Sequence, residues 1–173
     1  MTNIMESALE HILMSSYKEG MISFMDNHPE CFDEAIELAI SNKQPYSWRS
    51  AWLLWSCIEE NDKRIKGHID KIINSLKNKK DGHERELIKI LSKMELNEEQ
   101  EGYLFNICMT VWEKINKRPS VRHTAFMFIL KIAKKHPELR NEIAFFTQDQ
   151  YLDTLSPGVK NSIYRMIKEF THK

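Results

Sequence analysis

Four basic residues recur at nearly equal intervals along the chain. Arg49, Arg85 and Arg122 lie 36 and 37 residues apart, and Lys160 follows after a further 38 residues. The first three follow similar polar turns, in the stretches SNKQPYSWR, KNKKDGHER and INKRPSVRH. Guanidinium and ammonium groups donate hydrogen bonds to carboxylates, phosphates and carbonyl oxygens. The spacing therefore predicts either a repeated contact to carboxylates or turn carbonyls of neighbouring units, or a row of groups that binds an acidic partner.

Aromatic residues accompany the basic positions. Four residues after each basic position comes Leu53, Lys89, Phe126 or Tyr164, which places them on the same face of a helix. Mixed basic and aromatic character suits a peptide or protein ligand, because aromatic anchors often dominate interfaces. The predicted binding residues are Arg49, Arg85, Lys89, Arg122, Phe126, Lys160, Tyr164 and Trp48.

Three tryptophans lie close together in the first of these segments. Trp48, Trp52 and Trp55 follow the spacing i, i+4 and i+7, so they share one helical face. Trp52 aligns with the apolar Ile88 of the next copy, and we expect Trp52 and Trp55 to pack in the core. Trp48 aligns with Glu84, a position that tolerates charge, so we expect it to be partly exposed and to contact a partner.

A further set of basic residues lies in the turns themselves. Lys77, Lys79 and Lys80 recur at the equivalent turn 37 or 38 residues later. Such clusters can form a rim that binds phosphates, which keeps a nucleic acid open as the alternative partner. A solvated lysine-rich turn is the commoner explanation. The residues of this predicted basic rim are Lys77, Lys79, Lys80, Lys114, Lys117 and Arg118.

The sequence lacks the common motifs of catalytic and metal sites. It contains seven histidines but no His-Glu-x-x-His, no paired Cys-x-x-Cys, no Gly-x-Ser-x-Gly and no glycine-rich phosphate loop. His28 and His136 occur at equivalent His-Pro-Glu turns, so we interpret them as parts of a repeated structure. We therefore expect no metal, no cofactor and no catalytic residue, although a single carboxylate in a groove would leave no trace in the sequence.

Composition and charge indicate a folded cytoplasmic protein. Hydrophobic residues make up 42% and charged residues 29% of the 173 residues, and no apolar run is long enough to span a membrane. The three cysteines are expected to be reduced. The net charge is zero, yet residues 1–60 carry −7 and residues 61–173 carry +7. This asymmetry would allow the acidic end of one copy to meet the basic end of another.

The spacing of apolar residues predicts an all-α fold. They recur every three or four residues, as Phe32, Ile36 and Ala39 do, and no segment alternates strictly. The recurring turns mark a two-helix unit, which can bury its apolar face only by stacking on its neighbours. We predict one domain over 1–173 with a capping pair over 3–27 and helix pairs over about 30–60, 65–96, 98–136 and 139–172.

The second helix of these units resembles that of HEAT and armadillo-type repeats. The resemblance rests on Val121-Arg122 followed by Ala125, and on Val159-Lys160 followed by Ile163. It implies an α-α superhelix of about four to five stacked antiparallel helix pairs, whose second helices form a binding groove. It also implies a non-enzymatic intracellular scaffold that binds a protein or peptide. HEAT-like DNA glycosylases share the architecture, so an enzyme acting on alkylated DNA is the alternative that the resemblance implies.

Overall fold

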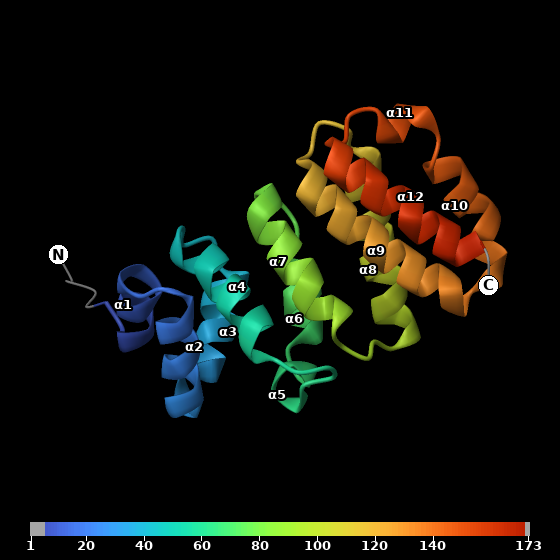
Figure 1. The fold of residues 1–173 in the computed structure, drawn as a ribbon. Helices are drawn as coiled ribbons and strands as arrows, with labels where there is room; N and C mark the ends of the chain where they lie inside the picture. The colour runs from blue at the N-terminus through green and yellow to red at the C-terminus, as the bar shows by residue number, and fades with distance from the viewer. Residues whose placement is uncertain (1–5, 172–173) are drawn as a thin grey trace. The chain divides into compact units, whose positions relative to one another are not determined.

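The computed structural model describes residues 6–171, which fold into helices joined by short turns (Figure 1). The predicted all-α fold is confirmed, since these residues contain no strand. In chain order the elements are α1 (Ala8–Ser15), α2 (Lys18–Asn27), η1 (Pro29–Cys31), α3 (Phe32–Ile40), α4 (Tyr46–Cys57), α5 (Lys63–Lys66), α6 (Ile69–Ser75), α7 (Asp81–Ser92), α8 (Glu98–Glu113), α9 (Pro119–Lys135), η2 (Pro137–Leu139), α10 (Arg140–Phe146), α11 (Asp149–Leu152) and α12 (Pro157–Thr171).

The chain divides into two compact units. Unit 1 comprises residues 1–95, in which α1 packs on α2, α3 on α4 and α6 on α7. The second helices of these pairs also pack on one another, α2 on α4 and α4 on α7. Unit 2 comprises residues 96–173, in which α9 packs on α8, α10 and α12. One domain over 1–173 stays a prediction, and residues 3–5 and 172 of its predicted first and last pairs lie outside the described residues.

Local sequence signals explain where several helices begin. Ser7 and Asn97 cap α1 and α8, and each forms a capping box with the residue three positions later. The two His-Pro-Glu turns adopt the same structure, because Pro29 and Pro137 each open a short 3-10 helix before α3 and α10. The His-Pro-Glu turn recurs because each copy lies where one helix pair ends and the next begins.

Each unit buries its own set of apolar side chains. Ile36, Leu53 and Leu54 are fully buried in unit 1, and Trp112 and Phe126 are fully buried in unit 2. Each such side chain contributes about 1.5–3 kcal/mol relative to an exposed one. All three cysteines carry free thiols. Among residues 6–171, no helix is both long enough and apolar enough to cross a membrane.

Candidate functional site

The three tryptophans of α4 form a partly exposed strip. Trp48 retains 37% of its surface exposed, and Trp52 and Trp55 are half-buried. The prediction for Trp48 agrees with this exposure, whereas the prediction that Trp52 and Trp55 lie in the core is wrong. We call Trp48, Trp52 and Trp55 the tryptophan strip.

One face of α7 runs along the tryptophan strip. A Cβ atom added at Gly82, near the start of α7, would lie 3.6 Å from Nε1 of Trp48. Near the end of α7, Nζ of Lys89 and Nζ of Lys93 lie 3.3 and 5.1 Å from the centre of the Trp55 ring. These distances are in the range of cation–π contacts. The tryptophan strip is therefore bordered by basic residues along the neighbouring helix.

The buried carboxylate of Glu86 holds two basic residues of α7 in place. The side chain of Glu86 is 0% exposed, and its two oxygens lie 2.7 Å from Nη2 of Arg85 and 2.7 Å from Nζ of Lys89. A buried carboxylate requires such partners, because its desolvation is otherwise too costly. Lys93 donates to the carbonyls of Trp55 and Ile58 at the end of α4. We call Arg85, Lys89 and Lys93 the basic edge, which carries three positive charges against the one negative charge of Glu86.

Arg49 lies on the other side of the tryptophan strip. Its guanidinium donates through Nε to the carbonyl of Leu13 and through Nη2 to that of Ser16, at the end of α1. The last carbonyls of a helix have no partner within it, and a basic side chain can supply one. Arg49 is half-buried and borders a pocket of about 260 Å³. The pocket is lined by Ser16, Tyr17, Lys18, Met21, Trp48, Arg49 and Trp52.

Arg122 and Phe126 do not lie at a surface. Both are 0% exposed, so their predicted place among the binding residues is corrected. Arg122 donates to the carbonyl of Trp112 at 3.0 Å, to that of Tyr151 at 2.6 Å and to Oγ1 of Thr154 at 2.8 Å. Burial lowers the pKa of Arg122 below its ordinary value. For this residue the structure shows the repeated contact to carbonyls that the spacing also allowed.

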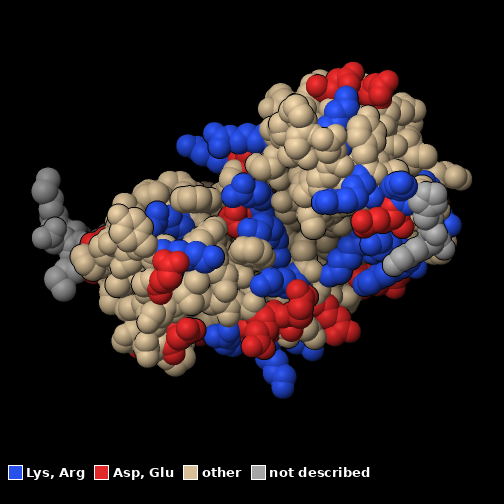
Figure 2. Space-filling model, viewed as in Figure 1, with Lys and Arg blue, Asp and Glu red and all other residues tan. Residues whose placement is uncertain are grey.

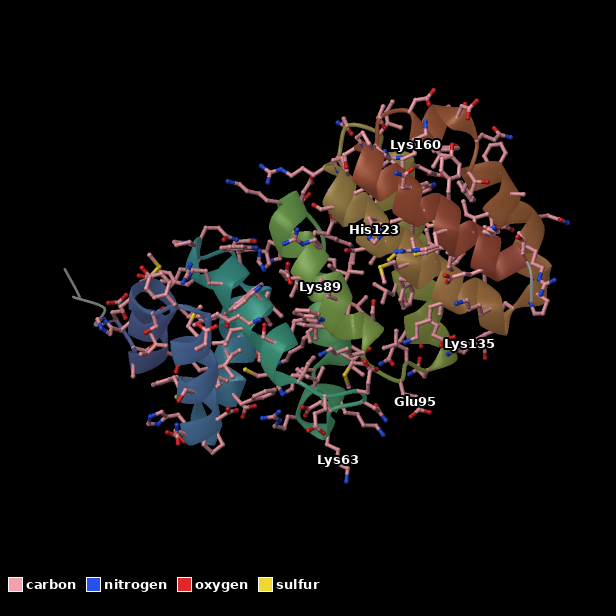
Figure 3. All side chains as sticks on the ribbon, viewed as in Figure 1. Lys63, Lys89, Glu95, His123, Lys135 and Lys160 are labelled. Atoms are coloured by element: carbon pink, nitrogen blue, oxygen red, sulfur yellow. The ribbon has the colours of Figure 1, made fainter. Side chains whose placement is uncertain are left out.

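Lys160 and Tyr164 lie on α12 of unit 2. Figure 3 labels Lys160. Nζ of Lys160 lies 2.9 Å from Oδ1 of Asp153, and this hydrogen bond raises the pKa of Lys160. Tyr164 is 47% exposed. Of the predicted binding residues, Trp48, Arg49, Arg85 and Lys89 therefore belong to unit 1, and Lys160 and Tyr164 belong to unit 2.

Lys79 does not belong to an exposed basic rim. It is 9% exposed, and its ammonium donates to the carbonyls of Ile40 and Ser41 at 2.7 Å and to Oδ1 of Asn42 at 2.8 Å. Burial lowers the pKa of Lys79. Its predicted role is corrected: the long side chain reaches back to the end of α3 and satisfies the carbonyls there.

The other residues of the predicted rim lie at or near the surface. Lys77 and Lys80 are exposed in unit 1, and Lys114 and Arg118 are exposed in unit 2, where Lys117 is half-buried. Phosphate binding by these residues stays a prediction.

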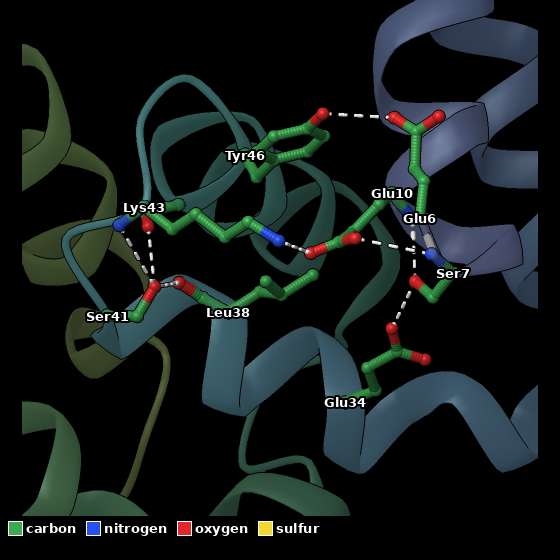
Figure 4. Close-up of polar contacts among 9 residues, drawn as sticks. Glu6, Ser7, Glu10, Glu34, Leu38, Ser41, Lys43 and Tyr46 are labelled. Atoms are coloured by element: carbon green, nitrogen blue, oxygen red, sulfur yellow. Dashed lines mark hydrogen bonds and ion pairs between the residues drawn. The ribbon is translucent and has the colours of Figure 1, made fainter. Parts of the chain in front are cut away.

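Sequence reasoning missed several polar contacts between helix pairs. Figure 4 shows Lys43 paired with Glu10, and the hydroxyl of Tyr46 donating to Glu6 at 3.0 Å. The hydrogen bond from Lys43 lowers the pKa of Glu10. Glu86 was also missed, although its position three residues before Lys89 is typical of intrahelical ion pairs.

The described residues show no arrangement of metal ligands. Within 6–171, no group of three or more His, Cys, Asp or Glu side chains could hold a metal ion. His83 is 2% exposed, and both of its ring nitrogens contact other protein groups. Nε2 lies 2.6 Å from the carbonyl of Ala39, and Nδ1 lies 3.0 Å from Nε2 of Gln44.

Comparison with known proteins identifies the repeat. The family model of the HEAT repeat domain matches residues 5–170, which is nearly the whole chain. No curated protein and no solved structure matches the chain. The family match agrees with the helix pairs of the fold. The chain therefore belongs to the HEAT repeat family.

Proposed function

We propose that this protein is a non-enzymatic scaffold that binds an acidic peptide segment of a partner protein. The binding surface comprises the tryptophan strip of α4 and the basic edge of α7, and we call it the α4–α7 surface. HEAT repeats are helical scaffolds that often serve protein interaction, commonly through surfaces built from stacked helices. The observation that carries the proposal is the partly exposed tryptophan strip with Lys89 and Lys93 over its Trp55 ring.

The charge of the α4–α7 surface favours an acidic ligand. Figure 2 shows Lys and Arg side chains gathered over the place of α7. Glu86 offsets one of the three positive charges of the basic edge, so the edge keeps a net positive charge. The Lys89 ammonium has three N–H donors, and its hydrogen bond to Glu86 uses one of them. A ligand carboxylate can accept a further hydrogen bond, while apolar atoms of the ligand cover the tryptophan rings.

A peptide fits these features better than a nucleic acid does. Lys79, one of the residues predicted to bind phosphate, donates three hydrogen bonds to atoms of Ile40, Ser41 and Asn42. The cations of the basic edge are likewise engaged in part by Glu86 and by carbonyls. Duplex binding draws its affinity from many free cations along the backbone, and it falls steeply with salt.

Fluorescence anisotropy with three labelled probes tests the proposal. The probes are a Glu/Ser dodecapeptide, the matching Lys/Ser dodecapeptide and a short DNA duplex. We expect the Glu/Ser peptide to bind, the Lys/Ser peptide not to bind, and Lys89→Met to weaken Glu/Ser binding about tenfold by removing a charge-assisted hydrogen bond. Lys89→Met leaves Arg85 on Glu86, and circular dichroism checks that the variant is folded.

Lys63→Met is the matched control, because Lys63 is an exposed lysine on α5 (Figure 3). It should leave the affinity for the Glu/Ser peptide unchanged. Duplex binding that collapses with salt, together with no binding of the Glu/Ser peptide, would instead favour a nucleic-acid partner. Equal losses from Lys89→Met and Lys63→Met would show that binding is unspecific charge attraction.

A further inference from the structure

The pocket beside Arg49 has the size of a single side chain. Its volume of about 260 Å³ is below the range of about 300–1,000 Å³ typical of small-molecule sites. Tyr17, Met21, Trp48 and Trp52 supply most of its wall. Tyr17 is 89% exposed and Trp48 is 37% exposed, so two aromatic rings at the mouth remain uncovered in the protein itself. Such a pocket gains most from an apolar side chain of a partner.

Two cations border the same pocket. Arg49 uses Nε and Nη2 for the carbonyls of Leu13 and Ser16, and its Nη1 has no hydrogen-bond partner among residues 6–171. Those two contacts fix the guanidinium before any ligand arrives, which lowers the entropy cost of binding. Lys18 is exposed and has no ion-pair partner in the described part of the chain. The border of the pocket therefore offers donors to an anion.

This combination selects among the possible ligands. Aromatic rings alone could bind a quaternary ammonium or a methylated lysine. Two positive charges beside the rings oppose a cation, and they favour a carboxylate close to the apolar group. We propose that the pocket receives a large apolar side chain that is followed directly by an acidic residue in the partner's peptide. The inference rests on the proposed function and adds the apolar side chain that anchors the peptide.

The pocket is continuous with the α4–α7 surface. Trp48 belongs to both, since it lines the pocket and its Nε1 faces Gly82 at the start of α7. Arg85 lies three residues after Gly82 and Lys89 seven residues after it, so all three share one face of α7. A peptide with its apolar residue in the pocket can thus cross Trp48 and place further carboxylates on the basic edge.

Three peptide probes separate this inference from the proposed function. The first is the Glu/Ser dodecapeptide; the second carries a central Phe-Glu pair, and the third a central Phe-Lys pair. We expect the Phe-Glu peptide to bind about tenfold more tightly than the Glu/Ser peptide, because one phenyl ring becomes buried. The Phe-Lys peptide should lose most of that gain.

Two variants test the pocket without threatening the fold. Tyr17→Ser removes one aromatic wall and places a favoured N-cap residue at the start of α2. Lys18→Gln removes one cation. We expect each variant to reduce the gain from Phe-Glu at least about threefold and to leave Glu/Ser binding within about twofold. Tyr103→Ser and Lys63→Gln are matched controls at exposed positions on α8 and α5.

Each other outcome has a defined meaning. Binding of the Glu/Ser peptide without any gain from Phe-Glu overturns the pocket and leaves the proposed function standing. A gain that survives both Tyr17→Ser and Lys18→Gln also overturns it, because the phenyl ring then binds elsewhere. A Phe-Lys peptide that binds as tightly as Phe-Glu overturns the assignment of charge. No binding of any acidic peptide overturns both proposals.

Discussion

Arg49 and Arg122 occupy the same position of the repeat but have different surroundings. Each donates to carbonyls at the end of a preceding helix, Arg49 to Leu13 and Ser16 and Arg122 to Trp112. Arg49 remains half-buried beside a pocket, whereas Arg122 is 0% exposed. Both arginines therefore make a structural contact, and such a residue can serve a ligand only where its guanidinium stays open.

The cause of the difference lies far along the chain. In unit 2, the carbonyl of Tyr151 and the hydroxyl of Thr154 accept hydrogen bonds from Arg122, and the guanidinium lies 4.7 Å from the centre of the Trp112 ring. Tyr151 belongs to α11, the short helix that precedes the final long one. In unit 1, Met21 and the open pocket lie beside Arg49 instead.

Replacing the two arginines should give the largest effect and sharpen this comparison. We expect Arg122→Met to lower the free energy of unfolding by about 3 kcal/mol or more, because buried carbonyls lose a charged donor. Arg49→Met should cost about 1 kcal/mol, because water can reach the carbonyls that it leaves. Urea unfolding of the full chain, followed by circular dichroism, measures both. Equal losses would show that exposure does not separate the two positions.

The fold was largely predictable from local patterns. Helix periodicity, the capping residues Ser7 and Asn97, and the prolines of the His-Pro-Glu turns all act within a few residues. The equivalent repeat positions of Arg49 and Arg122 were equally predictable, because they follow from the number of residues between them. The sequence also raised the possibility of contacts to turn carbonyls of neighbouring units. Arg49 donates to the carbonyl of Ser16 after α1, whereas Arg122 donates to that of Trp112 in α8, the helix paired with its own.

Burial and the candidate pocket were not predictable in the same way. The residues that precede Arg122 and Arg49, Val121 and Trp48, do not show which arginine is buried. The difference in burial depends on residues 151–154, which come about 30 positions after Arg122. The pocket combines residues 16–21 with residues 48–52, which no spacing rule connects. Lys79 likewise resembled a solvated turn lysine, because nothing local shows that its side chain reaches the end of α3.

Two tryptophans extend the comparison between the units. Trp112 is fully buried and donates through Nε1 to the carbonyl of Phe146 at 2.9 Å, whereas Trp52 is half-buried and lines the pocket. We expect Trp112→Phe to lower the free energy of unfolding by about 2 kcal/mol, because it leaves a buried carbonyl unpaired. Trp52→Phe should cost less than about 1 kcal/mol. Thermal unfolding of both variants checks this, and a larger loss from Trp52→Phe would contradict it.

Two lysines of one turn provide a smaller contrast. Lys79→Met should lower the free energy of unfolding by about 1 kcal/mol, because the carbonyls of Ile40 and Ser41 lose their ammonium donor. Lys80→Met, at the exposed neighbouring position, should have no measurable effect on stability. Urea midpoints of the two variants compare them directly. If Lys80→Met were the more destabilising, the assignment of Lys79 as the cap of α3 would be wrong.

The pH dependence of stability should be the smallest of these effects, and one histidine in each unit contributes to it. Burial lowers the pKa of His83, the hydrogen bond to Ala39 raises it, and the nearby Lys79 ammonium lowers it further; the net pKa lies below the ordinary value. In unit 2, burial and then Arg165 lower the pKa of His123. In both cases the unfolded chain binds a proton more readily than the folded protein does. Stability should therefore fall as the pH drops below about 6.5, the pKa of an unfolded histidine, and level off below the folded pKa values.

Substitution assigns this slope to particular histidines. His83→Gln can still donate to the carbonyl of Ala39 but cannot take up a proton, so we expect a shallower fall in stability between about pH 5 and pH 6.5. His123→Gln, which can still bond Ser162, should remove a separate part of the slope. The measurement is the free energy of unfolding in urea across this pH range. An unchanged slope in His83→Gln would mean that His83 binds its proton equally well in both states, and its contact with Gln44 would then carry no preference for the neutral ring.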